Sequence, residues 1–423
     1  MPPAMLSPTY LATVLPGLEF VAESELRAKL PGAATVETLR GKILVSAHQP
    51  PADLLQLRTV DNLYRFIARF PVGPHRAHLA DLAAAIAGLD LSPAAAEVLS
   101  ARAEPGRASA PTHPDGQRGA RDLHRPVAPH LRISGPPSPS VPASARPVAA
   151  PAGGTVPPRA GVTFYVNASR AGRHTYSRFE AAEAATGGIL ARQRRWRPGT
   201  AEAHDLEFRL DITGDEALVS LRLTPPSFRF RGQERLFARA ALRPPVAHAL
   251  VWLTTPQPSD CFVDPCCGSG TIVLERAAYA ARRIIGGDRS PEAAATARHN
   301  LALFAASADD TAGGSAGRAG EAGAAIMRWD ARRLPLAAGS IDRVATNLPF
   351  GHQILSTEAI LSLYHDLARE LERVLTPTGC AIVLTDQVEA LERAAGATRL
   401  RLAPLAVLSL KGLHPRVFRL AHG

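Results

Sequence analysis

Apolar residues recur along this chain with the two periods that distinguish strands from helices. Residues 10–30 begin with an apolar run typical of a strand, turn at a glycine and continue with apolar positions at helical spacing. Residues 35–47 alternate around Gly41 and predict a hairpin, residues 52–57 begin a helix, and residues 63–70 return as a strand. These elements predict a small α+β unit at the start of the chain.

Regular periodicity continues on both sides of a long segment that lacks it. Residues 79–91 have the apolar spacing of a helix, and order resumes at Gly161. Beyond that point the pattern predicts a strand, a helix and a two-stranded hairpin, over residues 162–169, 179–193, 206–213 and 217–223. We interpret the two sides as halves of a second α+β unit that an insertion interrupts.

The insertion covers residues 104–160. It contains 13 prolines in 57 residues, together with many Ser, Gly and Ala and few aliphatic residues. Such a composition buries too little apolar surface to offset the entropy lost on ordering. We therefore predict a disordered insertion. Its seven arginines against three acidic residues leave a contact with RNA open.

The rest of the chain alternates short apolar runs with helical patterns, which is typical of a parallel sheet covered by helices. Strands are predicted at residues 261–263, 341–345 and 380–385, helices at residues 242–253, 291–303 and 360–375, and a closing hairpin at residues 405–410 and 416–420. Between them, residues 305–325 form a low-complexity Ala, Gly and Ser segment that predicts a long loop.

Ligand-type residues follow the predicted strands of this last region. The first strand ends in a glycine-rich turn with Gly268 and Gly270, before a helix that opens near Thr271. Exposed N–H groups at a helix start suit a negatively charged group. Asp288 and Asp330 follow the next two strands, and residues 346–351 (TNLPFG) follow the one after. This arrangement predicts a nucleoside-binding crevice at the strand ends. Because Val273 stands where a dinucleotide fingerprint has its third glycine, the pattern does not favour NAD.

Composition narrows the class of protein. The formal net charge is +10, and the basic residues are nearly all arginine, with lysine only at Lys29, Lys42 and Lys411. Arginine suits phosphate recognition, although biased coding composition explains the count equally well. No apolar stretch approaches the ~20 residues of a membrane span, and no secretory signal is visible. Four cysteines without metal-ligand or disulfide spacing predict reduced thiols in a cytoplasmic protein without a metal.

Two motifs carry a family resemblance. Residues 264–271 (DPCCGSGT) resemble the first motif of S-adenosylmethionine-dependent RNA methyltransferases, and Asn347-Leu348-Pro349-Phe350 resembles their second motif. The pair is most similar to the THUMP-domain guanine-N2 tRNA methyltransferases. The resemblance implies an α/β fold, with a Rossmann-like seven-strand class I methyltransferase domain preceded by ferredoxin-like and THUMP domains. The implied bounds are 1–70 for the ferredoxin-like domain, 71–230 for THUMP, 231–255 for a linker and helix, and 256–423 for the methyltransferase domain.

The resemblance also implies roles for single residues. The expected contacts to S-adenosylmethionine are Asp264, Cys266, Gly268, Ser269, Gly270, Thr271, Asp288, Asp330, Ala331 and Asn347. The expected catalytic segment is Asn347, Leu348, Pro349 and Phe350. Two acceptors, the Asn347 side-chain oxygen and the Leu348 carbonyl, would direct the lone pair of the guanine 2-amino group toward the methyl group. The Phe350 ring would stack on a flipped base.

Clusters of arginine and aromatic residues predict contacts with RNA. One comprises Arg192, Arg194, Arg195 and Arg197 around Trp196, and the other comprises Arg229 and Arg231 beside Phe228 and Phe230. We expect a monomeric enzyme that acts on the acceptor stem of tRNA. Two alternatives stay open, namely the same chemistry on ribosomal RNA and an RNA-binding protein that keeps the fold without catalysis.

Overall fold

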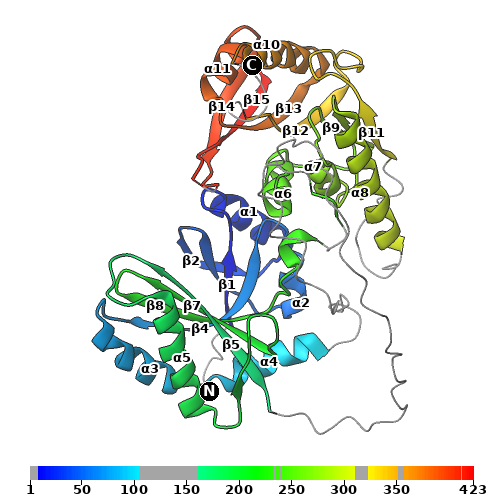
Figure 1. The fold of residues 1–423 in the computed structure, drawn as a ribbon. Helices are drawn as coiled ribbons and strands as arrows, with labels where there is room; N and C mark the ends of the chain where they lie inside the picture. Colours follow the sequence, from blue (N-terminus) through cyan, green and yellow to red (C-terminus); the bar gives the residue numbers. More distant parts are fainter. Residues whose placement is uncertain are drawn as a thin grey trace, which may run out of the picture.

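The computed structural model describes residues 8–103, 161–231, 235–237, 241–309, 323–350, 357–410 and 412–423. The predicted insertion at residues 104–160 lies outside these ranges, as do the middle of the predicted loop 305–325 and Lys411. Figure 1 shows two units along the long axis of the molecule, each built on one sheet. We call residues 8–231 the N-terminal unit and residues 241–423 the C-terminal unit.

The C-terminal unit is built on a seven-stranded sheet of strand order β11-β10-β9-β12-β13-β15-β14. Its strands are β9 (Cys261–Asp264), β10 (Arg283–Asp288), β11 (Gly323–Arg328), β12 (Ile341–Asn347), β13 (Leu375–Thr385), β14 (Leu400–Val407) and β15 (Arg416–His422). The first five strands in this order are parallel, and β15 and β14 join as an antiparallel pair. The predicted seven-strand methyltransferase sheet is confirmed.

Helices cover both faces of this sheet (Figure 1). They are α6 (Pro244–Leu253), α7 (Thr271–Arg276), α8 (Pro291–Asp309), α10 (Thr357–Val374) and α11 (Val388–Gly396). Side chains alternate between the two faces of a strand. Val263 and Val383 therefore pack toward α10 and α11, whereas Phe262 and Ile382 pack toward α6, α7 and α8. Because both faces are buried, the strands are apolar on both sides.

The N-terminal unit is one continuous eight-stranded sheet of order β2-β3-β1-β4-β8-β7-β5-β6. Its strands are β1 (Thr9–Thr13), β2 (Ala34–Leu39), β3 (Lys42–Ser46), β4 (Asn62–Pro71), β5 (Thr163–Ala171), β6 (Arg197–Pro198), β7 (Leu206–Thr213) and β8 (Glu216–Arg222). Its helices are α1 (Glu19–Lys29), α2 (Pro51–Leu54), α3 (Leu79–Ala87), α4 (Ser92–Ala103) and α5 (Arg178–Arg192). Because β4 pairs with both β1 and β8, one sheet joins the segments on either side of the insertion. The domain boundary at residue 70 stays a prediction.

Several element bounds differ from the sequence-based expectation. The closing hairpin pairs β14 with β15, so its first strand ends at Val407, not at residue 410. Residues beyond it leave the sheet, because the Ser409 N–H donates to the Pro16 carbonyl of the N-terminal unit at 3.1 Å. Helix α10 ends at Val374, since Leu375 already pairs with Ile341.

Two predicted segments contain more regular structure than expected. The predicted loop 305–325 is shorter than expected, because α8 continues to Asp309 and β11 begins at Gly323. In the N-terminal unit, the helix predicted over residues 79–91 ends at Ala87, and the unpredicted helix α4 follows from Ser92.

The two units meet through a shared apolar cluster. Leu15, Leu18 and Val21 of the N-terminal unit are buried in the same cluster as Val246 and Leu250 of α6. Helices α1 and α6 lie side by side at this junction (Figure 1). A common core of this kind fixes one unit relative to the other.

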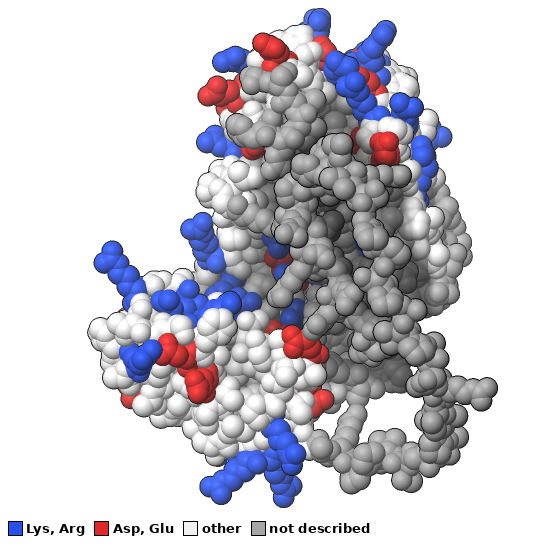
Figure 2. Space-filling model, in the orientation of Figure 1, with Lys and Arg blue, Asp and Glu red and all other residues white. Residues whose placement is uncertain are grey.

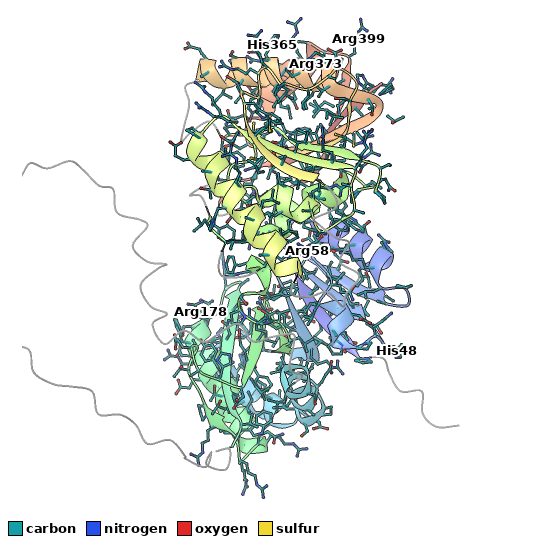
Figure 3. All side chains as sticks on the ribbon, turned by 90° about the vertical axis from the view of Figure 1, so that its right-hand side faces the viewer. His48, Arg58, Arg178, His365, Arg373 and Arg399 are labelled. Atoms are coloured by element: carbon teal, nitrogen blue, oxygen red, sulfur yellow. The ribbon has the colours of Figure 1, made fainter. Side chains whose placement is uncertain are left out.

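A buried carboxylate crosses the same junction. Glu275 in α7 is fully buried, and Arg58 of the N-terminal unit contacts its Oε2 through Nη2 at 2.8 Å and Nε at 3.0 Å. Arg231 and Arg235 lie 3.6 and 3.7 Å from its Oε1. Burial alone would raise the pKa of Glu275, but Arg58 and Arg231 outweigh burial and lower it to about 2. Figure 3 labels Arg58 where the units meet.

A second polar group supports the same contact. Glu25 in α1 accepts hydrogen bonds from the backbone N–H groups of Arg58 and Thr59, both at 2.8 Å. The fully buried His248 of α6 bridges the Thr59 hydroxyl at 2.9 Å and the Tyr279 hydroxyl at 2.6 Å. The junction is therefore closed by polar contacts with specific geometry as well as by apolar packing.

We expect Glu275→Gln to lower the free energy of unfolding by about 3–5 kcal/mol, because it leaves the facing guanidinium groups buried without a counter-charge. Urea titration of the full chain measures this. The control is Glu389→Gln, since the Glu389 side chain is 88% exposed and 4.0 Å from Arg393. It should change the free energy by less than about 0.5 kcal/mol. Equal effects of the two variants would contradict the assignment of Glu275 as the counter-charge of the buried guanidinium groups.

Acid should destabilise the junction through His248. Burial lowers the pKa of His248 to about 3, whereas an unfolded histidine titrates near ~6.5. The unfolded chain therefore binds a proton that the folded chain does not, and stability is lost as the pH falls below ~6.5. We expect this group to remove about 2 kcal/mol between ~pH 7 and ~pH 5. Urea titrations across this range should have a shallower pH slope for His248→Gln; an unchanged slope would exclude His248 as the source.

Candidate active site

The predicted ligand residues meet at one edge of the seven-stranded sheet. Strands β9, β10 and β12 are neighbours, and they end at Asp264, Asp288 and Asn347 respectively. Because parallel strands point the same way, their carboxyl ends lie together. The structure thus brings together the three positions that the sequence separates by more than 80 residues.

The glycine-rich turn has a backbone conformation that favours glycine. Gly268 and Gly270 have φ angles of 52° and 83°, in the left-handed region. The turn is closed by the Cys267 N–H, which donates to the Gly287 carbonyl at 2.9 Å, and by Asn300, whose side-chain amide donates to the Ser269 carbonyl at 2.9 Å. Helix α7 begins directly after Gly270.

Asp288 ties the ends of β9 and β10 together. Its Oδ2 accepts from the Gly268 N–H at 2.9 Å, and its Oδ1 accepts from the Ser290 N–H at 2.9 Å. Each oxygen of an ionised carboxylate has a second lone pair. Asp288 can therefore hold the turn and still accept two hydrogen bonds from a ligand.

Oδ1 of Asn347 is a buried polar atom at this edge without a hydrogen-bond partner among the described residues. Burial raises the pKa of Asp264 to about 7, and its Oδ1 accepts from the Cys266 N–H at 3.2 Å. A buried polar atom without a partner costs roughly 1–3 kcal/mol. The unpaired Asn347 oxygen indicates a position that a polar ligand completes.

Asp330 is partly exposed and already paired. Its carboxylate accepts from Arg332 Nη2 at 2.6 Å, and Ala331 beside it is buried. The preceding residue, Trp329, was not singled out from the sequence. Its indole N–H donates to the Pro265 carbonyl at 3.0 Å, and its ring lies against Gly287. The ring thus packs between the ends of β9 and β10.

The segment after β12 is anchored to the next strand. The Leu348 N–H donates to the Leu384 carbonyl at 3.0 Å, and the Leu348 side chain is buried. Pro349 and Phe350 are partly exposed, as a segment that meets a substrate requires. Residues 351–356, which include Gly351 of the predicted motif and His352, lie outside the described residues.

The adjacent cysteines are unsuited to covalent chemistry. Cys261, Cys266, Cys267 and Cys380 are all free. Burial raises the pKa of the Cys266 and Cys267 thiols, and the neighbouring Asp264 raises both further. A nucleophilic cysteine requires a lowered pKa. Both thiols therefore stay protonated and pack in the turn.

The predicted RNA-binding arginines fall into two groups. Arg192, Arg194, Arg195 and Arg197 are exposed at the end of α5 and the start of β6. Figure 2 shows positive side chains at the end of the N-terminal unit that is distant from the seven-stranded sheet. Trp196 between them is no stacking platform, because it packs on Phe164 and Phe208 with ring centroids 6.1 Å away.

The second group is split by burial. Arg229 lies over the partly exposed ring of Phe230 at 4.8 Å, within the short helix η3 (Phe228–Phe230). The prediction for Arg231 needs correction, because its side chain is 10% exposed and faces Glu275. The buried carboxylate attracts its guanidinium inward, so Arg231 belongs to the junction between the units.

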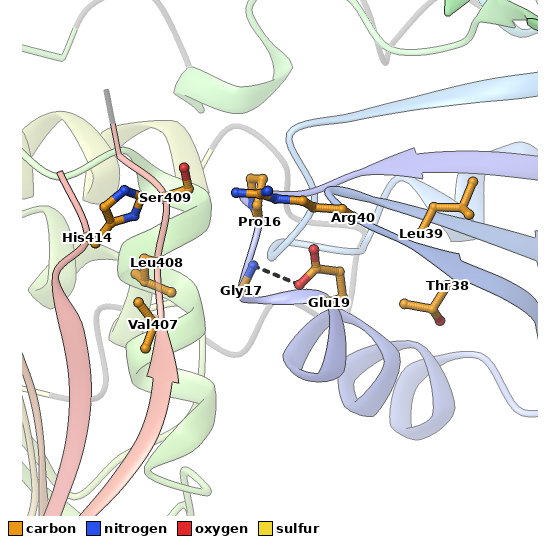
Figure 4. Close-up of a pocket in the computed structure, with 10 residues that line it drawn as sticks. All are labelled: Pro16, Gly17, Glu19, Thr38, Leu39, Arg40, Val407, Leu408, Ser409 and His414. Atoms are coloured by element: carbon orange, nitrogen blue, oxygen red, sulfur yellow. Dashed lines mark hydrogen bonds between the residues drawn. The ribbon is translucent and has the colours of Figure 1, made fainter. Parts of the chain in front are cut away.

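An open cleft lies between the N-terminal unit and the β14–β15 pair. Its volume is about 420 Å³, and Figure 4 shows Gly17, Glu19 and Arg40 on one side and Leu408 and His414 on the other. The cleft lies at the edge of the sheet where β12 and β13 end, because Val407 and Thr385 both pair with Arg416. The carboxyl edge of the sheet thus faces the N-terminal unit.

Within the described residues, no single helix is both long and apolar enough to cross a membrane; the bent pair Arg76–Ala87 and Ser92–Ala101 meets the length and composition only jointly. The same residues contain no group of three His, Cys, Asp or Glu side chains arranged to hold a metal ion.

Comparison with known proteins identifies the family. The RMKL-like methyltransferase domain matches residues 231–416. A Thermus thermophilus protein named tRNA (guanine(6)-N2)-methyltransferase is 31% identical over 264 residues, which cover 60% of this chain and 71% of that protein. The chain belongs to this methyltransferase family. The human tRNA (guanine(6)-N(2))-methyltransferase THUMP3 is 33% identical over 240 residues, covering 56% of this chain. The chain spans about half the length of this relative, 46%.

Solved structures with this fold cover nearly the whole chain. TrmN from Thermus thermophilus superposes with a TM-score of 0.67 at 23% identity, covering 98% of this chain and 99% of that one. A possible methylase from Clostridium difficile superposes with a TM-score of 0.66 at 16% identity, covering 98% of each chain. At these identities the likeness concerns the fold, and it includes both units.

The packing of Trp329 gives a test of the site's structure. We expect Gly287→Ala to cost about 1–3 kcal/mol of unfolding free energy, because a Cβ there would lie 1.9 Å from the Trp329 ring. Displacement of the ring should also change the tryptophan fluorescence. The control is Gly323→Ala on the neighbouring strand β11, where a Cβ meets nothing within 4 Å. If Gly287→Ala and Gly323→Ala match wild type in both measurements, Trp329 does not pack as described.

Proposed function

We propose that this chain transfers a methyl group from S-adenosylmethionine to the 2-amino group of a guanosine in tRNA. The observation that carries the proposal is the meeting of the glycine-rich turn, Asp288 and the Asn347–Phe350 segment at one sheet edge. The residues proposed to bind the cofactor therefore lie beside the segment proposed to contact the guanosine. The family of the chain and the names of its relatives support the same reaction.

The residues present fit S-adenosylmethionine. Gly268 leaves open space where a side chain would begin, and Asp288 keeps lone pairs free for ribose hydroxyls. The proposed contacts are Asp264, Cys266, Gly268, Ser269, Gly270, Thr271, Asp288, Asp330, Ala331 and Asn347. When bound, this cofactor supplies an electrophilic methyl group, so the protein has to supply alignment more than acid or base chemistry.

The Asn347–Phe350 segment is proposed to align the guanine. The 2-amino lone pair is delocalised into the ring, and two acceptors on its N–H bonds favour a pyramidal nitrogen. The unpaired Oδ1 of Asn347 and the Leu348 carbonyl are the proposed acceptors. Phe350 is proposed to stack on the flipped base. Asn347 is neutral and cannot take a proton, so the amine proton leaves to solvent.

The N-terminal unit is proposed to dock the RNA, with a ferredoxin-like part up to residue 70 and a THUMP part to residue 230. The exposed Arg192, Arg194, Arg195 and Arg197 and the Arg229–Phe230 pair support this, because arginine binds phosphate bidentately and aromatic rings stack on bases. The acceptor stem of tRNA is the proposed location of the guanosine. We further propose that the chain acts as a monomer in the cytoplasm.

The direct test is methylation by the full chain with isotope-labelled S-adenosylmethionine. Unmodified tRNA transcripts and ribosomal RNA are incubated in parallel, digested to nucleosides and analysed by mass spectrometry. We expect label in N2-methylguanosine from tRNA. Label in another nucleoside, or in ribosomal RNA alone, would overturn the proposal, and so would the absence of label in tRNA.

Asn347→Ala tests the alignment mechanism. It should lower the single-turnover rate of methylation by about 10²–10³, as loss of one oriented polar contact to a transition state typically does. Affinity for S-adenosylmethionine in calorimetry should fall far less than the rate, since Asn347 is one of ten proposed cofactor contacts but supplies one of only two proposed acceptors for the amine. Asn347→Asp is the matched control, because it keeps an acceptor oxygen and should retain partial activity. A near-normal rate for Asn347→Ala would contradict the mechanism.

A further inference from the structure

A chain of hydrogen bonds runs beneath the Asn347–Phe350 segment. Tyr364 of α10 is buried, with 1% of its surface exposed, and its hydroxyl lies 3.3 Å from the Pro349 carbonyl oxygen. The same hydroxyl lies 2.6 Å from Oγ1 of Thr385, which is fully buried at the end of β13. Thr385 Oγ1 in turn accepts from the Gln387 N–H at 2.8 Å. Helix α10 and the end of β13 are thus linked to the Pro349 carbonyl through the Tyr364 hydroxyl.

The chemistry of the donors sets the direction of this chain. In the contact with Pro349 the carbonyl only accepts, so Tyr364 is the donor. The Tyr364 oxygen then accepts the Thr385 proton, and Thr385 accepts from the Gln387 backbone. Burial raises the pKa of Tyr364, which keeps this hydroxyl protonated. Aligned donors of this kind polarise one another in a buried site.

We infer that Tyr364 is a positioning residue for methyl transfer, which holds the Leu348 carbonyl in the orientation that the guanine amine requires. The backbone on both sides of the Leu348 carbonyl is constrained. On one side the Leu348 N–H is bonded to Leu384. On the other side the Pro349 ring restricts the backbone and the next carbonyl is held by Tyr364.

Without the Tyr364 proton, this restraint is lost at one end. The Pro349–Phe350 peptide could then rotate and carry Phe350 and the Leu348 carbonyl away from the base. Tyr364 has its hydroxyl on the Pro349 carbonyl and acts through the backbone, so its loss should affect the rate and leave cofactor binding unchanged. The inference rests on the proposed function.

The test compares Tyr364→Phe with Tyr176→Phe in the full chain. Tyr176 is also buried, and its hydroxyl donates to the Gly73 carbonyl at 3.1 Å in the N-terminal unit. Both variants remove one tyrosine-to-backbone hydrogen bond, and Tyr364→Phe also removes the contact with Thr385, so it should lose the more thermal stability of the two. We expect Tyr364→Phe to lower the single-turnover rate on tRNA about 10-fold, the effect of one hydrogen bond. KM for tRNA and calorimetric affinity for S-adenosylmethionine should stay unchanged, and Tyr176→Phe should keep the wild-type rate.

Thr385 variants test the chain without altering the tyrosine. Thr385→Val removes the hydroxyl and should lower the rate in the same direction, whereas Thr385→Ser keeps it and should match wild type. The double variant Tyr364→Phe with Thr385→Val should be no slower than Tyr364→Phe alone, because one pathway is interrupted twice. Additive losses would overturn the inference. If Tyr364→Phe does not fold, the comparison of Thr385→Val with Thr385→Ser tests the inference by itself.

The outcomes separate the two proposals. If wild type does not methylate guanosine in tRNA, the proposed function fails. If wild type does so and Tyr364→Phe keeps the wild-type rate, only the positioning role of Tyr364 fails. A Tyr364→Phe variant that loses cofactor affinity in parallel with rate would also overturn it, since that result indicates collapse of the whole edge.

Discussion

The buried ion pair of Arg58 with Glu275 is the contact on which the arrangement of the two units depends. Its partners are 217 residues apart in the chain, and Glu275 has no exposed surface. A carboxylate is kept charged in such a place only when its counter-charges are fixed around it. The pair therefore holds the N-terminal unit in one orientation relative to α7. Since α7 opens at the glycine-rich turn, the same contact relates the N-terminal unit to the carboxyl edge of the seven-stranded sheet.

At the carboxyl edge of the seven-stranded sheet, a buried polar atom lacks a partner, in contrast to the paired charges of the junction. Apolar packing on both faces orders the strands, whereas Asn347 keeps a buried side-chain oxygen unpaired where β12 ends. Such atoms are costly in the free protein and are paired when a ligand brings complementary groups. Ordered strands with an unpaired acceptor at their carboxyl edge suit a reaction that depends on the alignment of its reactants.

Much of this organisation could be predicted from the sequence. The glycine-rich turn, Asp288 and the Asn347–Phe350 segment were identified by their order, and a parallel sheet places successive strand ends on one edge. Boundaries were less predictable. Residues 408–410 have the apolar pattern of a strand but lie outside β14, and Ser409 bonds to Pro16 of the N-terminal unit. Leu375 joins β13 because Ile341 is there to pair with it. A local pattern contains no information about such distant partners.

The sequence by itself determined which residue types stand at the site and after which strand each one follows, because both can be read from local spacing. Tertiary structure alone decided what each side chain faces. Arg231 looks like a surface cation beside Phe230, yet Glu275 draws it into the junction. Trp196 looks like a platform for a base, yet it packs on Phe164 and Phe208 and is partly buried. Tyr364 has no motif, and its link to Pro349 exists only because α10 packs beneath the end of β12. The environment of a side chain depends on residues that approach from elsewhere in the chain, and that approach exists only after folding.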